Sequence, residues 1–382
     1  MTVMPDRIQP ALLWIGATLA VLLLGATLFT LSGLYSVAAS RGHFPWTSWL
    51  LELGMHRSVA THSLFVESPP PLDDPNLIRL GASHFQGGCV PCHGAPGERS
   101  NPIVHRMLPP PPDLSRSTQT WSDKELFWIV KNGIKYTGMP AWVSLARDDE
   151  VWAIVAFLRA LPKLDAVEYA TMTRTRDASE HRSPNERARF GSGTQSISVC
   201  ARCHGLDSSP PVSNLVPVIA GQSEAYLQAA LRQYADGQRE SGIMQPVAAE
   251  LDNSAIAALA KYYAGLIPAL AAPSNATPEE IERGQAIATL GIASKGIPPC
   301  LACHTGSTGT FPLLAGQHGA YTINQLKLWQ QGLRDTTAHG AIMAPIAKRM
   351  TSDQIRDVAG FFESLGTTAQ PLQDKTSARK ER

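Results

Sequence analysis

The chain has 382 residues, of which 44% are hydrophobic and 17% are charged, and its formal net charge is +1. This length allows two to four domains of ordinary size. A net charge so close to zero provides no global basic field, so we expect no nucleic-acid partner. A local docking face for another protein stays open, because separated patches of opposite charge cancel in the sum.

An uncharged N-terminal stretch, residues 8–40, contains a strongly apolar segment at residues 11–34. About 20 residues are enough for a helix to cross a bilayer, whereas the hydrophobic core of a signal peptide usually has about 7–15. We therefore expect residues 1–40 to be an uncleaved membrane anchor with one transmembrane helix. A cleaved signal peptide is the alternative, because the small residues at 38–40 could form a cleavage site.

The residues on either side of the apolar segment carry few charges. Arg7 precedes it and Arg41 and Arg57 follow it, so the positive-inside rule does not orient the helix. Trp46 and Trp49 lie just beyond the segment and are suited to the membrane–water interface.

All six cysteines lie in three motifs, in each of which a histidine directly follows two cysteines separated by two residues. The motifs are Cys89-Val90-Pro91-Cys92-His93, Cys200-Ala201-Arg202-Cys203-His204 and Cys300-Leu301-Ala302-Cys303-His304. An even number of cysteines in an exported protein normally indicates disulfides, and Cys-x-x-Cys alone also occurs in redox pairs and zinc sites. None of these explains the three histidines. The motif is the attachment site of a c-type haem, so the sequence predicts three covalently bound haem c groups.

Each motif assigns roles to three side chains. We expect the two cysteines to form thioethers with the haem vinyl groups, because one helical turn presents both sulfurs to the porphyrin edge. The histidine reaches the iron as the proximal ligand, which gives His93, His204 and His304. The other ring nitrogen of such a histidine should donate to a backbone carbonyl. Pro217 and Pro312 are the predicted acceptors for His204 and His304.

The distal ligand of each iron must come from elsewhere in the chain. A methionine thioether is a common distal ligand in electron-transfer cytochromes, where it raises the potential. Met139, Met244 and Met343 lie 50, 44 and 43 residues after the first cysteine of their motifs, each in a predicted proline-containing loop before a final helix. His105 and His339 are the competing ligands, which we interpret as surface residues or neighbours of the site. The histidines without a spacing that favours a metal site are His43, His56, His62, His84, His181 and His318.

The three motifs recur once in every hundred residues or so, which predicts repeated domains. The predicted organisation is an anchor (1–40), a juxtamembrane linker (41–74), a first domain (75–163), a linker (164–185), a second domain (186–268), a linker (269–276), a third domain (277–366) and a polar tail (367–382).

Counted from Gly221 and Gly316, the second and third domains align with each other without a gap as far as Arg239 and Arg334. The matched residues are Gly221-Gln222 with Gly316-Gln317, Tyr226 with Tyr321, Leu231 with Leu326, Gly237 with Gly332 and Arg239 with Arg334. The first domain differs, since it has a proline run at residues 109–112 and then Gly-Met-Pro-Ala-Trp at residues 138–142.

Helix signals are found in all three domains. Capping boxes are predicted at residues 122–125, 277–280 and 351–354, and an apolar face at residues 151–158 is followed by Pro162. No convincing strand periodicity is present. We therefore expect an all-α fold, with an N-terminal transmembrane helix followed by three cytochrome c-like helical domains.

These features resemble those of class I c-type cytochromes. Residues 186–366 resemble the tandem di-haem cytochrome c4 type through their haem motifs, the repeated Ala-Gly-Gln and Gly-x-Arg segments and the late methionines. Residues 75–163 resemble a membrane-anchored mono-haem cytochrome c, with Cys-x-x-Cys-His-Gly and the Gly-Met-Pro-Ala-Trp loop. The resemblance implies haem attachment outside the bacterial inner membrane. It thus implies a single-pass protein with a cytoplasmic N-terminus and periplasmic haem domains.

A methionine for each iron favours an electron carrier over an enzyme. The expected function is single-electron transfer between respiratory-chain partners, towards a terminal oxidase, with a quinol-oxidising complex or dehydrogenase as other possible partners. The alternative is a cytochrome c subunit of a membrane-bound periplasmic dehydrogenase. A haem peroxidase or reductase would need an open distal site, and no sensor or DNA-binding segment accompanies the haems.

Overall fold

The computed structural model describes residues 8–98, 101–173, 197–206, 209–268, 274–305 and 309–367. Within these ranges the regular structure is helical, and the strand-type pairing is limited to an isolated bridge between Ile292 and Ile297. The expected all-α fold is thus confirmed. The chain divides into two compact units, residues 1–56 with 102–111 and residues 57–101 with 112–382.

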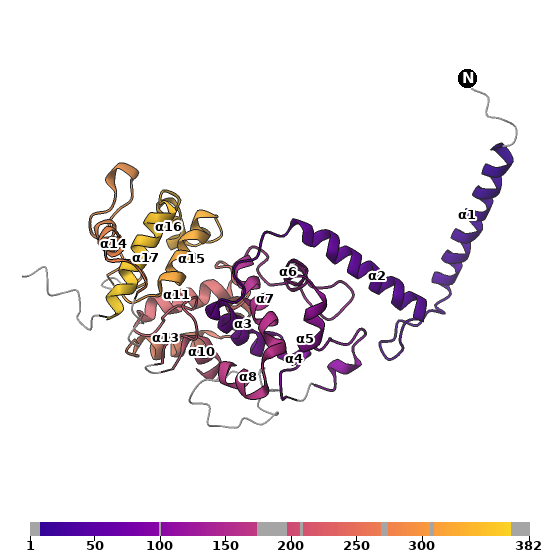
Figure 1. The fold of residues 1–382 in the computed structure, drawn as a ribbon, viewed down its shortest axis with the longest axis horizontal. Helices are drawn as coiled ribbons and strands as arrows, with labels where there is room; N and C mark the ends of the chain where they lie inside the picture. Colours follow the sequence, from indigo (N-terminus) through magenta and orange to yellow (C-terminus); the bar gives the residue numbers. More distant parts are fainter. Residues whose placement is uncertain are drawn as a thin grey trace, which may run out of the picture. The chain divides into compact units, whose positions relative to one another are not determined.

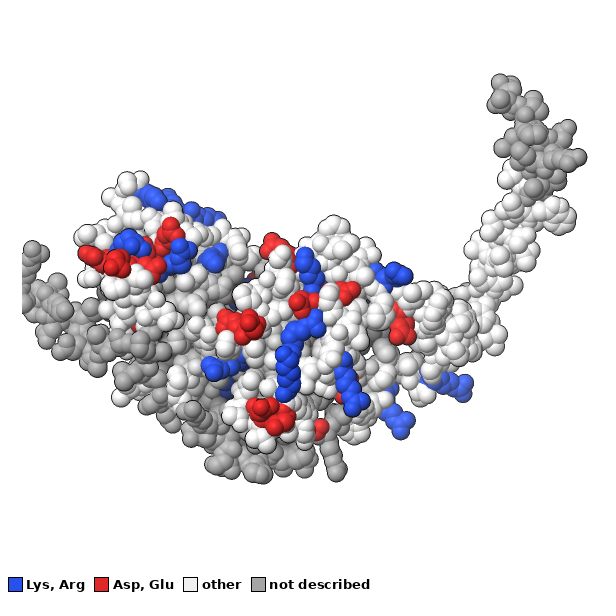
Figure 2. All heavy atoms as spheres, in the orientation of Figure 1, with Lys and Arg blue, Asp and Glu red and all other residues white. Residues whose placement is uncertain are grey.

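The first unit begins with the apolar helix α1 (Ile8–Leu31). Its segment Leu12–Leu31 has a mean hydropathy of 2.2 and no buried residue, and no other helix in the described ranges is long and apolar enough to cross a membrane. Figure 2 shows this helix without charged side chains. A signal sequence near the N-terminus would share this length and composition.

A second long helix, α2 (Pro45–His62), follows in the segment expected to be a juxtamembrane linker. The sequence analysis did not predict it, because its apolar residues are spread around the helix rather than gathered on one face. Trp46 and Trp49 lie on α2 and are exposed, with 67% and 64% of their surfaces accessible.

The first domain is built on two crossing helices, α3 (Pro75–Gly88) and α7 (Asp148–Ala160). Its other helices are α4 (Val90–His93), α5 (Leu114–Ser117), α6 (Asp123–Asn132) and α8 (Ala166–Thr173), with 3₁₀ turns at Thr118–Thr120 and Leu161–Lys163. The 3₁₀ turn Ser63–Phe65, in the segment expected to be the juxtamembrane linker, packs against α6. Phe85 of α3 and Phe157 of α7 meet in its core, with ring centroids 4.9 Å apart.

Helix α8 lies in the segment expected to be the linker after the first domain. Tyr169 on this helix is 2% exposed and packs against Phe85 and Phe157, and its hydroxyl donates to Gln86. The beginning of that segment is therefore part of the first domain's core.

The second domain contains α10 (Ile197–His204), α11 (Glu224–Ala235), α12 (Met244–Ala249) and α13 (Asn253–Ala264). The third contains α14 (Pro278–Leu290), α15 (Gly319–Gln330), α16 (Ala338–Lys348) and α17 (Ser352–Ser364), which Figure 1 shows as one group. Short 3₁₀ turns are found at Ala293–Lys295, Cys300–Ala302 and Leu365–Thr367. Helices α14 and α17 pack together as α3 and α7 do in the first domain.

The predicted helix starts are confirmed in detail. Ser122, Thr277 and Thr351 each accept a hydrogen bond from the third residue of the following helix, and that residue's side chain returns a bond to the cap. Several expected segments lie outside the described residues, namely most of the 164–185 linker with His181, the start of the second domain, residues 269–273 and the tail from 368 onwards.

Two equivalent glycines allow the close helix crossings. A β-carbon at Gly81 would overlap the carbonyl oxygen of Ala153, and one at Gly284 would overlap that of Asp357. We expect Gly81→Ala and Gly284→Ala each to destabilise the protein by about 1–3 kcal/mol through overpacking. Denaturant unfolding followed by circular dichroism checks this.

Gly265 provides the matched control, because it has a right-handed conformation and a β-carbon there would meet atoms only at 3.5 Å. Gly265→Ala should therefore be neutral or slightly stabilising. Equal unfolding midpoints for Gly81→Ala and Gly265→Ala would contradict the account of the crossing.

Candidate haem sites

Each cysteine–histidine motif forms a tight turn that places its functional atoms on one side. The His93 N–H donates to the Cys89 carbonyl at 2.9 Å, and the His304 N–H donates to the Cys300 carbonyl at 3.0 Å. In the second domain the whole motif lies on α10. Because residues three and four apart lie on the same face of a helical turn, both sulfurs and the imidazole project together.

All three motif histidines are held in the same way by a proline carbonyl. The Nδ1 atoms of His93, His204 and His304 lie 3.0, 3.2 and 2.9 Å from carbonyl oxygens. The acceptors are Pro112, Pro217 and Pro312, respectively. A carbonyl can only accept, so Nδ1 carries the proton and Nε2 keeps the lone pair that a metal needs.

The acceptors Pro217 and Pro312 confirm the sequence prediction. Pro112 was missed, because it lies 19 residues after its histidine, against 13 and 8 residues in the other two domains. Pro112 is the last residue of the proline run at residues 109–112, and this position was the sequence signal that could have identified it as the acceptor.

Burial favours the metal-binding form of two of these histidines. It lowers the pKa of both His204 and His304, although the proline carbonyls act in the opposite direction. The neutral imidazole that results is the form that binds a metal.

The three methionines occupy different local structures. Met139 lies in a loop as expected, but Met244 is the first residue of α12 and Met343 lies inside α16. The expectation of a loop was therefore wrong for these two. Pro246 falls in the first turn of α12, where a missing N–H breaks no helical bond, and Pro345 is accommodated within α16.

The Met139 loop is held against the end of α6. The Met139 carbonyl accepts from the Ile134 N–H at 3.2 Å, and the Met139 N–H donates to the Thr137 hydroxyl at 3.1 Å. The Trp142 N–H donates to the Lys131 carbonyl at 2.9 Å. These bonds fix the loop close to the core on which Cys89 and Trp142 both pack.

One cavity of about 930 Å³ joins the second and third sites. Its lining includes Cys200, Cys203, His204 and Met244 from the second domain and Cys300, Cys303, His304 and Met343 from the third. Its volume is at the upper end of the range for ligand pockets. The cysteines, histidine and methionine of the first domain do not line it.

Two arginines in the wall of this cavity form no ion pair with an acidic residue of the described ranges. Arg239 is 5% exposed and donates to the Tyr321 hydroxyl and the Gln325 side chain, to which Arg334 also donates. No carboxylate in the described ranges forms an ion pair with either one. Buried cations need a compensating anion. The carboxylate groups of haem would supply it, so the donor set of this cavity fits haem.

Two other kinds of site are not supported by the geometry. All six cysteines are free rather than joined in disulfides. Across the described ranges, no three His, Cys, Asp or Glu side chains converge as a zinc site requires.

A reciprocal pair of glutamines connects the second and third domains. The Gln222 side chain donates to the Leu313 carbonyl at 2.7 Å and accepts from the Leu313 N–H at 2.9 Å. Gln317 makes the same two bonds with Val218, at 3.1 and 2.9 Å. Leu313 and Val218 directly follow the prolines that hold His304 and His204. Each domain therefore supports the proximal histidine of the other.

Comparisons with known proteins agree with this geometry. A family model described as "Cytochrome C oxidase, cbb3-type, subunit III" matches residues 76–158. Cytochrome c-552 of Acidithiobacillus ferridurans is 37% identical over 44% of this chain and 73% of its own length. A thiosulfate dehydrogenase electron acceptor of Thiomonas intermedia is 36% identical over 47% and 82%. Cytochrome c4 of Pseudomonas aeruginosa is 30% identical over 45% and 87%.

Helical domains that present Cys-x-x-Cys-His turns define the c-type cytochromes, which bind haem c covalently. The chain belongs to the class I c-type cytochromes and, within them, resembles cytochrome c4. It is accordingly an electron carrier whose partners are redox proteins.

The reciprocal bonds of Gln222 and Gln317 predict that a substitution in one domain changes the haem site of the other. Gln222→Ala leaves the Leu313 N–H and carbonyl without partners, and each unsatisfied group costs about 1–3 kcal/mol. We expect destabilisation together with a changed spectrum of the haem in the third domain, although the substitution is in the second.

Gln317→Ala should change the haem of the second domain in the same way. The control is Gln228→Ala, since Gln228 bonds only to Glu224 and Arg232 on its own helix. Visible absorption and electron paramagnetic resonance spectra check the result. A change confined to the substituted domain would contradict the reciprocal arrangement.

Proposed function

We propose that the protein carries single electrons through three haem c groups, one in each of the domains 75–163, 186–268 and 277–366. The observation that carries this proposal is the repeated hydrogen bond from the proximal histidine to a proline carbonyl. Because all three domains prepare Nε2 for a metal in this way, the geometry supports a haem at each of the three motifs.

The proposed covalent attachment points are Cys89, Cys92, Cys200, Cys203, Cys300 and Cys303. The proposed axial ligands are His93 with Met139, His204 with Met244 and His304 with Met343. Haem supplies reversible one-electron chemistry at iron. The cysteines would keep it bound, the histidines would orient it, and the methionines would favour the reduced state and block access of a substrate to the iron. A methionine for each iron supports a carrier rather than a haem peroxidase or reductase.

We further propose that α1 anchors the protein in the bacterial inner membrane and that the haem domains lie in the periplasm. The length and apolar composition of α1 support the anchor. The exposed Trp46 and Trp49 on the next helix support an adjacent membrane interface.

The proposed direction of transfer is towards a terminal oxidase. The match of residues 76–158 to a family named for an oxidase subunit supports the first domain as the donor to such an oxidase. Relatives named as electron acceptors of thiosulfate dehydrogenase support a periplasmic dehydrogenase as the source, with a quinol-oxidising complex as the other candidate. The same relatives favour, as a second proposal, a role as the cytochrome subunit of such a dehydrogenase.

The charges on one face of the protein are mixed. On the face shown in Figure 2, acidic and basic side chains are interspersed rather than gathered into a field of one sign. This face therefore provides no long-range field that would steer a strongly charged partner.

Replacement of each methionine tests the ligand assignment. Met139→Ala, Met244→Ala and Met343→Ala should each remove one of three methionine-to-iron charge-transfer signals in the near-infrared spectrum and lower one midpoint potential. Each variant should also gain one haem that binds carbon monoxide when reduced. Met350→Leu is the control, because Met350 is buried in the third domain's core and the change conserves volume.

The unsubstituted protein should keep all three near-infrared signals and bind no carbon monoxide. Ready carbon monoxide binding by a native haem would instead indicate an open site, and with it an enzyme.

Sequencing the mature N-terminus tests the anchor. We expect the chain to retain residues 1–40, to sediment with membranes and to be released by detergent but not by salt, because its attachment is hydrophobic. A mature chain that begins after residue 40 and remains in the soluble fraction would contradict the anchor and leave the electron-carrier proposal intact.

A further inference from the structure

Glu150 is a buried carboxylate of the first domain whose partners lie largely in the second. It is 4% exposed and is the third residue of α7. Its Oε1 accepts from the Ser241 hydroxyl and its Oε2 from the Gly242 N–H, both at 2.6 Å. The Trp142 indole N–H also lies 3.3 Å from Oε2.

The position of Glu150 in its helix makes this choice of partners unusual. Glu125 and Glu280 are also the third residues of their helices, and both bond to the N-cap backbone of the same helix. Arg147, which precedes α7, offers no side-chain cap, and Glu150 reaches into the second domain instead. A buried carboxylate without hydrogen bonds is strongly unfavourable. Because Ser241 and Gly242 supply hydrogen bonds to Glu150, the burial of this carboxylate is compensated when the two domains are in contact.

The hydroxyl that Glu150 binds is the one that holds Met244. Ser241 Oγ donates to Glu150 and accepts from the Met244 N–H at 2.9 Å and the Ile243 N–H at 3.2 Å. Ile243 provides no side-chain cap for α12, so this serine satisfies the start of the helix. In the third domain, by contrast, Met343 lies inside α16, which its own Thr337 caps.

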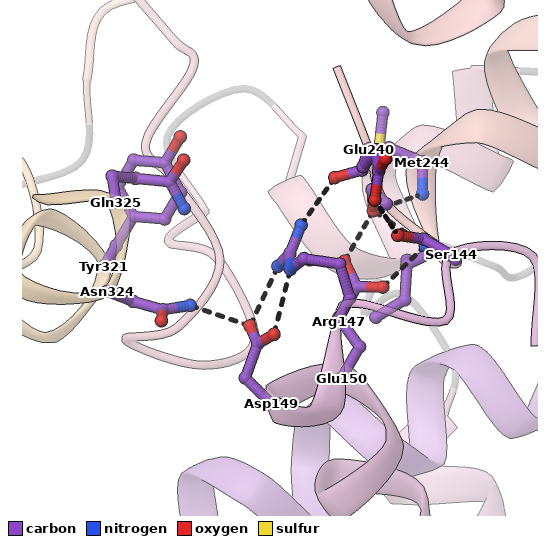
Figure 3. Close-up of polar contacts among 12 residues, drawn as sticks. Ser144, Arg147, Asp149, Glu150, Glu240, Met244, Tyr321, Asn324 and Gln325 are labelled. Atoms are coloured by element: carbon purple, nitrogen blue, oxygen red, sulfur yellow. Dashed lines mark hydrogen bonds and ion pairs between the residues drawn. The ribbon is translucent and has the colours of Figure 1, made fainter. Parts of the chain in front are cut away.

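Arg147 strengthens the same contact (Figure 3). It is 8% exposed, donates to the Glu240 carbonyl at 2.8 Å and lies 3.0 Å from Glu150 Oε1. Its other bonds go to Asp149, which also accepts from Asn324 of α15 in the third domain at 2.9 Å. The charged side chains next to Glu150, those of Arg147 and Asp149, thus come from the start of α7. Hydrogen bonds with residues of the second and third domains hold them in place.

The loop that carries Met139 also touches the turn that precedes Met244 and α12. A β-carbon at Gly242 in this turn would overlap the indole ring of Trp142, which is three residues after Met139. Leu80 and Ala153 of the first domain also pack on Val216, with Cys203 against the same cluster. The first domain therefore covers the side of the second domain that bears both Cys203 and the turn before Met244.

We propose that Glu150 is a positioning residue for Met244, through which docking of the first domain sets the distal ligation of the second haem. This inference rests on the proposed role of Met244 as an iron ligand. Loss of the carboxylate frees Ser241, loosens the first turn of α12 and lets the thioether move away from the iron. A haem that loses its methionine has a lower potential, so the second haem would then be a poorer acceptor from either neighbour.

The experiment compares Glu150→Ala, Glu150→Gln and Ser241→Ala in the full chain carrying its haems. We expect Glu150→Ala to lose one of the three near-infrared methionine signals, to lower one of three midpoint potentials and to bind carbon monoxide at one haem. Glu150→Gln should restore part of the signal, because its single amide oxygen accepts from only one of the two partners. Ser241→Ala removes the same hydrogen bond from the side of the second domain, so it should have the same spectroscopic effects as Glu150→Ala.

The matched control is Asp357→Asn, which changes a carboxylate that is 4% exposed and paired with Arg283 within the third domain. It should keep all three signals and potentials. Covalent haem content and circular dichroism identify any variant that fails to fold. Met244→Ala is the reference, and if it changes no haem then the ligand assignment itself is wrong. If Met244→Ala removes a signal but Glu150→Ala and Ser241→Ala keep all three, the positioning role is overturned.

Discussion

A hydrogen bond from a histidine Nδ1 to a proline carbonyl is present at all three candidate haem sites, and the orientation of each motif histidine depends on it. The bond fixes the imidazole tautomer and its orientation, so that Nε2 is available to a metal. The three segments that contain these prolines differ in length and sequence, yet each places a proline carbonyl beside the Nδ1 of its motif histidine. In the second and third domains, the residue that follows the proline is bonded to a glutamine of the other domain. The local histidine–proline bond is therefore connected to the contact between these two domains.

The contacts between domains are polar and buried, which makes them specific. Gln222 and Gln317 satisfy backbone groups beside the opposite proximal histidine, and Glu150 with Ser241 supports the distal side of the second domain. Buried polar groups are unfavourable unless they are fully satisfied, so such contacts tolerate few alternative arrangements. The second domain is consequently supported near His204 by the third domain and near Met244 by the first.

This arrangement gives the three domains different roles in the proposed electron path. The first domain matches a family named for an oxidase subunit and follows the apolar N-terminal helices. The second and third share one cavity and resemble the tandem cytochrome c4 type. Because the first domain covers the Cys203 and Met244 side of the second, that side is less accessible to a redox partner.

The haem motifs, the helical class, the capping boxes and the apolar N-terminal helix were determined by sequence alone, because each depends on residues within one or two helical turns. The acceptors Pro217 and Pro312 were also predictable from the repeat, because each precedes an Ala-Gly-Gln segment, whereas Pro112 was not, since the first domain lacks that segment. The helical setting of Met244 and Met343, the glutamine exchange and the Glu150 contact were decided only by tertiary structure. Glu150 and Ser241 are 91 residues apart, and no local pattern specifies which buried polar groups meet when separate helices pack.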